Sequence, residues 1–348
     1  MLEDQINPLH QAAMKQARTH WNQIAKPLHS LGLLEDMVVQ MAGITETAEV
    51  RMDKRAVIVM CADNGVVTEG VTQSDSSVTA IVAEAMCRGD GNINNLARTY
   101  GADVKVIDIG MQTDVETNGS KYDKVAYGTR NLAQEAAMTE DQASHAIAIG
   151  IYHVSHCKRE GYQILVTGEM GIGNTTTSSA IASVLLGRSP AEVTGRGAGL
   201  DDAGWKRKVE IITRALERKP LSKERPMELL AEVGGLDIAG LVGVFLGGGM
   251  YRIPVVIDGF IATVAAALAV QLAPQVKDYM LCSHVSEEPA AKELLASLGL
   301  RPVITAGLCL GEGTGGVMLL PLLDGALALY HSDHSFAGLQ MEPYEEKK

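Results

Sequence analysis

Residues 163–187 read QILVTGEMGIGNTTTSSAIASVLLG, and this stretch decides the fold class. It opens with an apolar run typical of a buried strand, turns at a cluster of glycines (168–173) and continues in a helical pattern from residue 174. A strand that leads through a tight glycine turn into a helix is typical of an α/β fold. Backbone N–H groups at the start of such a helix attract an anion.

Strand-like and helix-like segments alternate on both sides of this stretch. The strand-like runs are almost continuously apolar, as expected for parallel strands that are covered on both faces. The sequence therefore predicts an α/β fold with a mostly parallel sheet, helices on both faces and a helical segment within residues 1–50. The expected strands span 56–61, 104–109, 163–168, 254–258, 279–283 and 302–307; the expected helices span 75–98, 139–160, 174–187, 202–218, 236–250 and 259–272.

Polar or glycine-rich turns follow several of the expected strands. In open α/β sheets the ligand binds beyond the carboxyl ends of the strands. We therefore expect these turns to line one cleft, built from loops 61–76, 168–176, 195–208, 257–260 and 311–316.

The composition excludes some classes of partner. The chain has 348 residues, of which 46% are hydrophobic, enough for a sizeable core. Its formal net charge is −12 and it has no long basic run, which argues against a nucleic-acid partner. A small anion can still bind to one positive pocket of an acidic protein.

The sequence predicts neither secretion nor a membrane span. The N-terminal stretch is acidic and polar, unlike a signal peptide. The most apolar uncharged run, residues 259–276, is rich in alanine and contains Pro274, so we expect a buried helix there. We expect a cytoplasmic protein.

The cysteines and histidines predict no disulfide and no metal site. The five cysteines are scattered and form no CxxC pair. His153, His156 and Cys157 look like metal ligands, but no further ligands lie near them in the sequence.

The turn GEMGIGNT (168–175) nearly matches a nucleotide-binding P-loop. Gly168 and Gly173 have the required separation, but Asn174 stands where the P-loop lysine would be. Without that lysine, a single phosphate fits the turn better than a triphosphate. The alternative is an ordinary tight turn with an Asn or Thr helix cap.

The turn GEGTGG (311–316) matches the dinucleotide pattern GxGxxG but does not suit a dinucleotide. Glu312 would place a carboxylate beside a pyrophosphate, and His331 stands about 20 residues on, where a ribose-binding acid is expected. A carboxylate on a glycine turn is better suited to accept a proton or to stabilise a developing cation. The alternative is that Glu312 caps the helix that follows it.

The stretch GRGAGLDDAGWKRK (195–208) supplies a further flexible loop, followed by Lys206, Arg207 and Lys208. A basic side chain next to an anion-binding turn could close over the anion. At least two of the three are expected on a solvated helix face instead.

The motifs together resemble one family. Their order along the chain is CADNGVVTEGV (61–71), GEMGIGNTT (168–176), GRGAGL (195–200), VGGLDIAGLVG (233–243), IDGF (257–260), SHVSEE (283–288) and LGEGTGG (310–316). Over about residues 20–330 the chain resembles the nicotinate-nucleotide–dimethylbenzimidazole phosphoribosyltransferases.

This resemblance implies a pentosyltransferase of cobamide (cobalamin) biosynthesis. Such an enzyme moves the phosphoribosyl group of nicotinate mononucleotide onto 5,6-dimethylbenzimidazole or a related base and yields α-ribazole 5′-phosphate and nicotinate. The resemblance also implies a Rossmann-like large domain (51–324), a small helical domain from both chain ends (1–50 with 325–348), and a dimer. It implies neither a metal nor another cofactor.

The resemblance also implies roles for individual residues. Glu312 matches the catalytic base and Glu169 a second acid at the site. The residues implied to bind the nucleotide and its phosphate are Gly171, Gly173, Asn174, Thr175, Thr176, Gly197, Lys208, Asp258, Ser286 and Gly313. Those implied in the acceptor pocket are His29, Asn64, Ser74, Val82 and Leu310.

The chemistry suits these residue types. Displacement at the anomeric carbon needs a nucleophile that has lost its proton and a stabilised, cation-like ribose, and a carboxylate can serve both needs. The departing nicotinate already carries a positive ring nitrogen, so no acid is needed to expel it.

The chain departs from the family near the acceptor, which leaves alternatives open. KPLHSLG (26–32) stands in place of the usual KPPGSLG, Asn64 in place of a histidine and Val82 in place of a glutamine. The acceptor could therefore be a purine, or a phenol such as p-cresol, with the chain as one half of a heterodimer with a paralogue. A non-catalytic nucleotide-binding partner subunit is a further alternative, against which Glu312 and Glu169 count.

Overall fold

The computed structural model describes residues 5–345 and contains a five-stranded parallel sheet at its centre. The strand order is β2-β1-β3-β4-β5, and every neighbouring pair is parallel. The α/β fold predicted from the sequence is thereby confirmed. The strands are β1 (Arg55–Ala62), β2 (Ala102–Gly110), β3 (Ile164–Met170), β4 (Val255–Ile257) and β5 (Met280–Cys282).

A second, two-stranded parallel sheet is formed by β6 (His284–Ser286) and β7 (Ile304–Leu308). The strand expected over 302–307 belongs to this sheet and not to the central one. Strand β6 was not expected, because Ser283 separates it from β5 by one residue and a three-residue strand has too little pattern to recognise.

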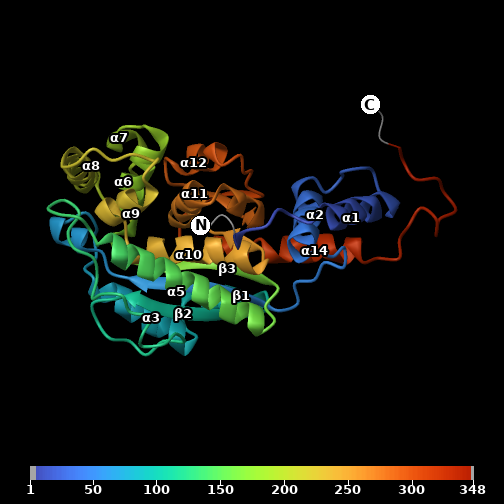
Figure 1. Ribbon diagram of the computed structural model, residues 1–348, viewed down its shortest axis with the longest axis horizontal. Helices are drawn as coiled ribbons and strands as arrows, with labels where there is room; N and C mark the ends of the chain where they lie inside the picture. The colour runs from blue at the N-terminus through green and yellow to red at the C-terminus, as the bar shows by residue number, and fades with distance from the viewer. Residues whose placement is uncertain (1–4, 346–348) are drawn as a thin grey trace.

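Helices cover both faces of the central sheet, because alternate side chains of β1 enter two different cores. Ile58 and Met60 pack with α5 (Glu140–Arg159), α10 (Leu236–Tyr251) and α11 (Phe260–Leu272). Val57 and Val59 pack in the other core, with α3 (Ser77–Arg88), α4 (Asn92–Thr99) and α13 (Thr314–Val317). Figure 1 shows α5 and α10 lying over one face of the strands.

The two chain ends meet in a group of helices formed by α1 (Gln11–Gln23), α2 (Leu33–Thr45) and α14 (Leu320–Tyr330), far from α8 in Figure 1. Trp21 meets Tyr330 edge-on with ring centroids 5.0 Å apart, and the Tyr330 hydroxyl donates to the Ala48 carbonyl at 2.8 Å. The expected boundary between residues 324 and 325 falls inside α14. Residues 1–4 and 346–348 of the expected small domain lie outside the described residues.

The helix expected over 75–98 is two helices in the structure, α3 and α4. Gly89 has a φ of +87°, which ends α3, and α4 begins after Gly91. The remaining helices are α6 (Asn174–Leu186), α7 (Pro190–Val193), α8 (Asp202–Glu217), α9 (Pro226–Val233) and α12 (Ala291–Ser297), with 3₁₀ helices η2 (Gly65–Glu69) and η3 (Pro274–Tyr279).

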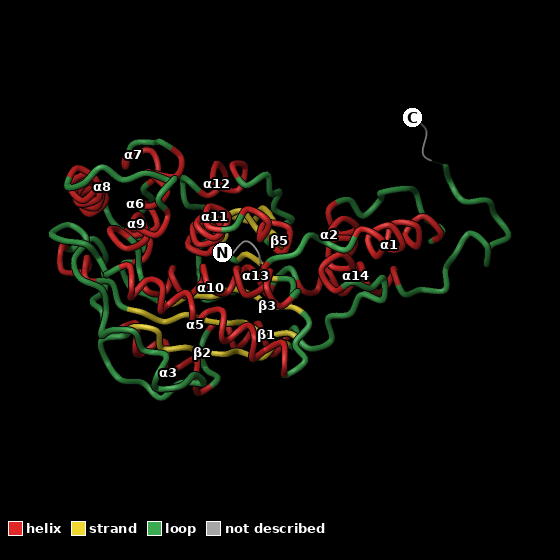
Figure 2. Tube along the Cα trace, viewed as in Figure 1, coloured by secondary structure: helices red, strands yellow, loops and turns green. Residues whose placement is uncertain are grey.

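A long loop lies beside the sheet, and one apolar helix is buried. Figure 2 shows the long irregular connection between β2 and α5, residues 111–139, as a loop beside the sheet. The apolar run 259–276 forms the buried helix α11 and then η3. Within residues 5–345, no helix has the length and apolar character needed to cross a membrane.

Candidate active site

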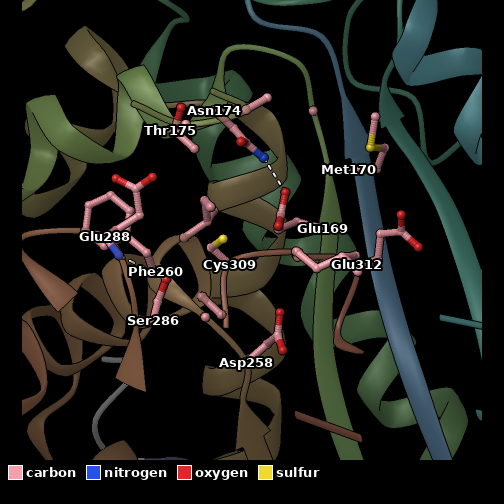
Figure 3. Close-up of a pocket in the computed structure, with 18 of the residues that line it drawn as sticks. Glu169, Met170, Asn174, Thr175, Asp258, Phe260, Ser286, Glu288, Cys309 and Glu312 are labelled. Carbon is pink, nitrogen blue, oxygen red and sulfur yellow. Dashed lines mark hydrogen bonds between the residues drawn. The ribbon is translucent and has the colours of Figure 1, made fainter. Parts of the chain in front are cut away.

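A cavity of about 300 Å³ opens beyond the carboxyl ends of β3 and β4 (Figure 3). Four of the expected loops contribute to its wall: 168–176, 195–208, 257–260 and 311–316. From loop 61–76 only Thr72 is among the lining residues. Glu169 and Glu312 line the same cavity, as the convergence of the turns predicted.

Two glycine turns approach each other closely at the floor of this cavity. A Cβ atom on Gly168 would lie 2.6 Å from the carbonyl oxygen of Glu312, so only glycine permits the contact between the end of β3 and the turn 311–316. Gly173, with φ +92°, then turns the chain into α6, which begins at Asn174. The glycines therefore bring Glu169, Glu312 and the start of α6 to one place.

The start of α6 is supported from behind by a buried lysine. Lys208 is fully buried, and its Nζ donates to Thr175 Oγ1 at 2.8 Å. Burial lowers the pKa of Lys208 to about 8, opposed by the negative charge of Glu288. Thr175, Gly197 and Glu288 line the cavity, whereas Lys208 is not among the lining residues. The lysine thus reaches the cavity through the Thr175 hydroxyl and does not project into it.

Glu169 belongs to a buried acidic network. The Nδ2 of Asn174 donates to the carboxylates of both Glu169 and Asp237, the latter at 3.0 Å. Burial, followed by the charge of Asp237, raises the pKa of Glu169 well above its usual value, and burial raises the pKa of Asp237 to about 6. The surroundings therefore favour the protonated form of Glu169.

Asp258 fastens the turn that carries Glu312. Its Oδ1 accepts the N–H of Gly316 at 2.7 Å and its Oδ2 accepts the N–H of Gly313 at 3.2 Å. Burial raises the pKa of Asp258 to about 6, although these N–H groups oppose the shift. Asp258 lines the cavity, while the N–H of Gly313 is already bonded to its carboxylate.

Glu312 is held by a different helix from the one it was considered to cap. Its backbone is left-handed, with φ +61°, and its side chain is buried. Oε1 accepts from Asn92 Nδ2 at 2.9 Å, and Oε2 accepts the N–H of Ile93 at 3.1 Å, both at the start of α4. In Figure 3 the Glu312 carboxylate points away from that of Glu169.

Of the residues predicted to contact the acceptor, two lie at the cavity. Val82, on α3, and Leu310, which is largely exposed, both line it. Asn64, Ser74 and His29 are not among the lining residues. Asn64 is buried and its Nδ2 donates to the Ile172 carbonyl at 3.3 Å, which supports the glycine turn from outside.

Ser74 and His29 lie on other segments. Ser74 precedes α3, where its N–H donates to Thr72 Oγ1 at 3.4 Å. His29 lies in the turn between α1 and α2, with φ +55°.

The predicted nucleotide-binding residues are mostly together. Those that line the cavity are Gly171, Gly173, Asn174, Thr175, Gly197, Asp258 and Ser286; those that do not are Thr176, Lys208 and Gly313. Thr176 is fully buried one residue behind Thr175.

Several lining residues were not anticipated: Met170, Phe260, His284, Glu288 and Cys309. Burial lowers the pKa of His284 to about 4, so it is neutral at physiological pH, and its Nδ1 lies 2.9 Å from Ser283 Oγ. His284 and Glu288 both fall within the string SHVSEE, which was the one sequence signal that pointed to them.

The histidines suspected of binding metal have other partners. His153 Nε2 lies 2.9 Å from Asp123 Oδ2, and His156 Nε2 lies 3.1 Å from Glu160 Oε1. Within the part of the chain that the structure describes, no group of three or more His, Cys, Asp or Glu side chains could hold a metal ion.

Comparison with known proteins gives consistent matches over nearly the full length. A family model described as phosphoribosyltransferase matches residues 6–339. The nicotinate-nucleotide–dimethylbenzimidazole phosphoribosyltransferase of Clostridium acetobutylicum is 43% identical over 99% of this chain and 97% of its own length. The enzyme of the same name from Desulforudis audaxviator is 45% identical over 94% and 93%.

Solved structures agree with these matches. The crystal structure of CobT from Thermus thermophilus superimposes with a TM-score of 0.89 at 37% identity, covering 95% of this chain and 99% of that one. From the family model, the sequence relatives and the shared fold together, we conclude that this chain belongs to the nicotinate-nucleotide–dimethylbenzimidazole phosphoribosyltransferase family.

Proposed function

We propose that the protein transfers the phosphoribosyl group of nicotinate mononucleotide to a lower-ligand base of the benzimidazole type in cobamide biosynthesis. One observation carries the proposal: a helix start that favours an anion and two carboxylates, Glu169 and Glu312, line a single cavity. That cavity provides for a phosphate at one end and for proton transfer at the other. The names of the relatives support the same substrates.

Glu312 is the proposed general base. The imine nitrogen of the benzimidazole attacks the anomeric carbon, and the ring N–H proton of the benzimidazole passes to the Glu312 carboxylate. The bond from the anomeric carbon to nicotinate breaks with its electron pair, which neutralises the pyridinium ring. Glu169 is the weaker candidate for a base because its raised pKa favours the protonated form, which suits hydrogen-bond donation.

The mononucleotide phosphate is proposed to bind at the start of α6. Gly171, Gly173, Asn174, Thr175 and Thr176 form this start, with Gly197 and Ser286 on the adjoining wall. Lys208 contributes its charge through the hydroxyl of Thr175. Asp258 and Gly313 act by fixing the turn 311–316 next to the proposed nucleotide site.

The acceptor is proposed to bind against the apolar side chains of Val82 and Leu310, with Met170 nearby in the wall. An apolar wall suits a flat, weakly polar ring and offers no partner for the exocyclic polar groups of a purine. We propose 5,6-dimethylbenzimidazole or a close analogue. Asn64 and Ser74 act on this wall indirectly, through the segments next to it.

The assembly is proposed to be a cytoplasmic dimer. The small unit (1–50 with 325–348) carries His29 outside the cavity of its own chain, so a contact between His29 and an acceptor requires a second subunit. Five unpaired thiols suit a reducing compartment.

Incubation of the purified chain with nicotinate mononucleotide and a panel of acceptors tests the function. We expect nicotinate release to depend on a benzimidazole, with formation of an α-riboside 5′-phosphate. Preferential use of phenols would move the chain to the phenolic branch of the family. No transfer to any acceptor, with mononucleotide binding intact, would identify a non-catalytic subunit.

A further inference from the structure

The start of α4 presents two hydrogen-bond donors to Glu312 from a part of the chain more than 200 residues away. Asn92 Nδ2 donates to Oε1 at 2.9 Å, and the N–H of Ile93 donates to Oε2 at 3.1 Å. Each carboxylate oxygen therefore has one donor from α4. Each also keeps a second acceptor position, which can receive a proton from a bound base.

The start of α4 also has a hydrogen bond of its own. Asn94, the third residue of the helix, accepts the N–H of Gly91 with its Oδ1 at 3.0 Å and so closes the helix start locally. That bond leaves the side-chain amide of Asn92 and the first-turn N–H of Ile93 to find partners outside the helix. Their common partner is the Glu312 carboxylate.

Asn92 and Glu312 differ in their exposure to solvent. Asn92 is an exposed residue, whereas Glu312 is only 7% exposed. The amide of Asn92 thus provides the buried Glu312 carboxylate with a directed donor.

The backbone of Glu312 is fixed independently of its side chain. Asp258 holds the N–H groups of Gly313 and Gly316, so the turn is tied down from the side of β4. The freedom that remains to Glu312 is the rotation of its side chain. Asn92 and Ile93 determine that rotation.

We propose that Asn92 is a positioning residue for acceptor activation, an inference that rests on the proposed role of Glu312 as general base. Asn92 aims the Glu312 carboxylate, so that it removes the ring proton of the acceptor during attack on the anomeric carbon. Helix α4 follows α3, which carries Val82, after only three residues. The segment that shapes the acceptor wall therefore also orients the base.

The test compares Asn92→Ala with Asn95→Ala in the full-length protein. Asn95 is an exposed asparagine of the same helix, and its Nδ2 donates to the Gly91 carbonyl at 3.3 Å. Steady-state kinetics with 5,6-dimethylbenzimidazole give kcat and the KM for each substrate. Solvent deuterium isotope effects on kcat report how far proton transfer limits the rate.

For Asn92→Ala we expect kcat to fall about tenfold. This loss is near the lower end of the range for one hydrogen bond to a charged group, because the N–H of Ile93 still donates to Glu312. The KM for nicotinate mononucleotide should stay within about twofold, and the solvent isotope effect should rise. Asn92→Asp should lower kcat more than Asn92→Ala does, because the new carboxylate repels that of Glu312. Asn95→Ala should match the parent protein.

Equal kcat in Asn92→Ala and Asn95→Ala would overturn the positioning role, as would a fall in kcat with an unchanged isotope effect and a parallel rise in both KM values. Glu312→Gln, measured alongside, separates this failure from a failure of the proposed function. If Glu312→Gln loses turnover while Asn92→Ala does not, only the role of Asn92 is wrong. If Glu312→Gln keeps full turnover, Glu312 is not the base and the role of Asn92 fails with it.

Discussion

At the scale of single residues, the two acids of the cavity differ because their neighbours differ. Glu169 shares the amide of Asn174 with a second buried acid, Asp237, and its burial, followed by the charge of Asp237, raises its pKa. Glu312 instead receives two donors from α4. Two carboxylates in one cavity are thereby suited to different tasks, one to hold a proton and the other to accept one.

Replacing Glu312 by Gln tests whether Glu312 takes up the proton of the substrate. The substitution keeps the size of the side chain and removes its basicity, so turnover on a neutral benzimidazole should fall by roughly 10²–10⁴-fold. Mononucleotide binding, measured by calorimetry, should change much less because the phosphate is proposed to bind at the start of α6. Near-normal turnover would rule out the role and make Glu169 the next candidate.

Replacing Lys208 by Ala tests the charge behind the phosphate turn. Loss of the ammonium group removes the donor to Thr175, so mononucleotide affinity should fall by about 1.5–3 kcal/mol. Arg207→Ala is the matched control, since Arg207 is exposed and donates to the Gly70 carbonyl at 3.2 Å. Unchanged affinity in Lys208→Ala would count decisively against the phosphate site.

The depressed pKa of Lys208 predicts a pH dependence of mononucleotide binding. With its pKa at about 8, Lys208 carries its charge below that pH and loses it as the pH rises above it. The phosphate therefore loses an attractive charge, and affinity should decline from about pH 7 to pH 9. The sign for folding is opposite: the buried charge destabilises the free protein at low pH, and this cost is relieved as the pH rises from 8 toward 10.5.

Calorimetric titrations at several pH values measure this effect. The decline should be absent in Lys208→Met, which keeps the bulk of the side chain without its charge. A decline of equal size in the methionine variant would assign it to another group.

At the scale of secondary-structure elements, what could be predicted depended on length and pattern. The five strands of the central sheet were recognisable because a short apolar run that ends at a polar or glycine-rich turn is most often a buried strand. Helix α12 and strand β6 were not predicted, because seven and three residues are too few to show a periodic hydrophobic pattern. The division of 75–98 into α3 and α4 was missed, although Gly89 and Gly91 marked it.

The residues that line the cavity could be predicted only in part, for a related reason. Residues on the turns after β3 and β4 could be grouped because topology alone brings strand ends together. The pairing of Glu312 with Asn92 could not, since it depends on how α4 packs against a turn far along the chain. Asn64 was placed in the acceptor pocket, whereas its side chain supports the Ile172 turn from outside.

Helix α3 provides a test of acceptor selection. Val82 lines the cavity, so Val82→Gln adds a polar group to the apolar wall and should improve acceptors with exocyclic polar groups, such as adenine, relative to dimethylbenzimidazole. Competition assays with paired acceptors measure the ratio of kcat/KM values. The KM for the mononucleotide should not move.

Ile81→Gln is the control for Val82→Gln, because Ile81 is the adjacent residue of α3 and is 59% exposed. A shift of the same size in both variants, or an unchanged ratio in Val82→Gln, would show that this wall does not select the acceptor.

At the scale of the whole molecule, the cavity and the chain-end helices are separate features that share a core. The cluster containing Trp21 and Tyr330 continues to Val57 and Val59 of the sheet, so the chain-end helices share a hydrophobic core with the sheet. Its helices nevertheless extend away from the α8 end of the molecule in Figure 1. Helices that protrude in this way are suited to reach a neighbouring subunit, which supports the proposed dimer.

The dimer predicts that a variant damaged in the small unit can complement one damaged at the cavity. If His29 of one subunit completes the acceptor site of the other, His29→Asp should raise the acceptor KM, because a carboxylate is placed against an apolar ring. Glu312→Gln removes the base. A mixed dimer of the two variants then contains one site with both an intact Glu312 and an intact His29, and one site that lacks both.

Random mixing after unfolding and refolding should restore normal acceptor KM at about a quarter of the sites, by the statistics of a two-site closed dimer. Light scattering establishes the mass of each species. A monomeric mass, or mixtures whose activity only adds that of the separate variants, would show that each chain builds its acceptor site alone.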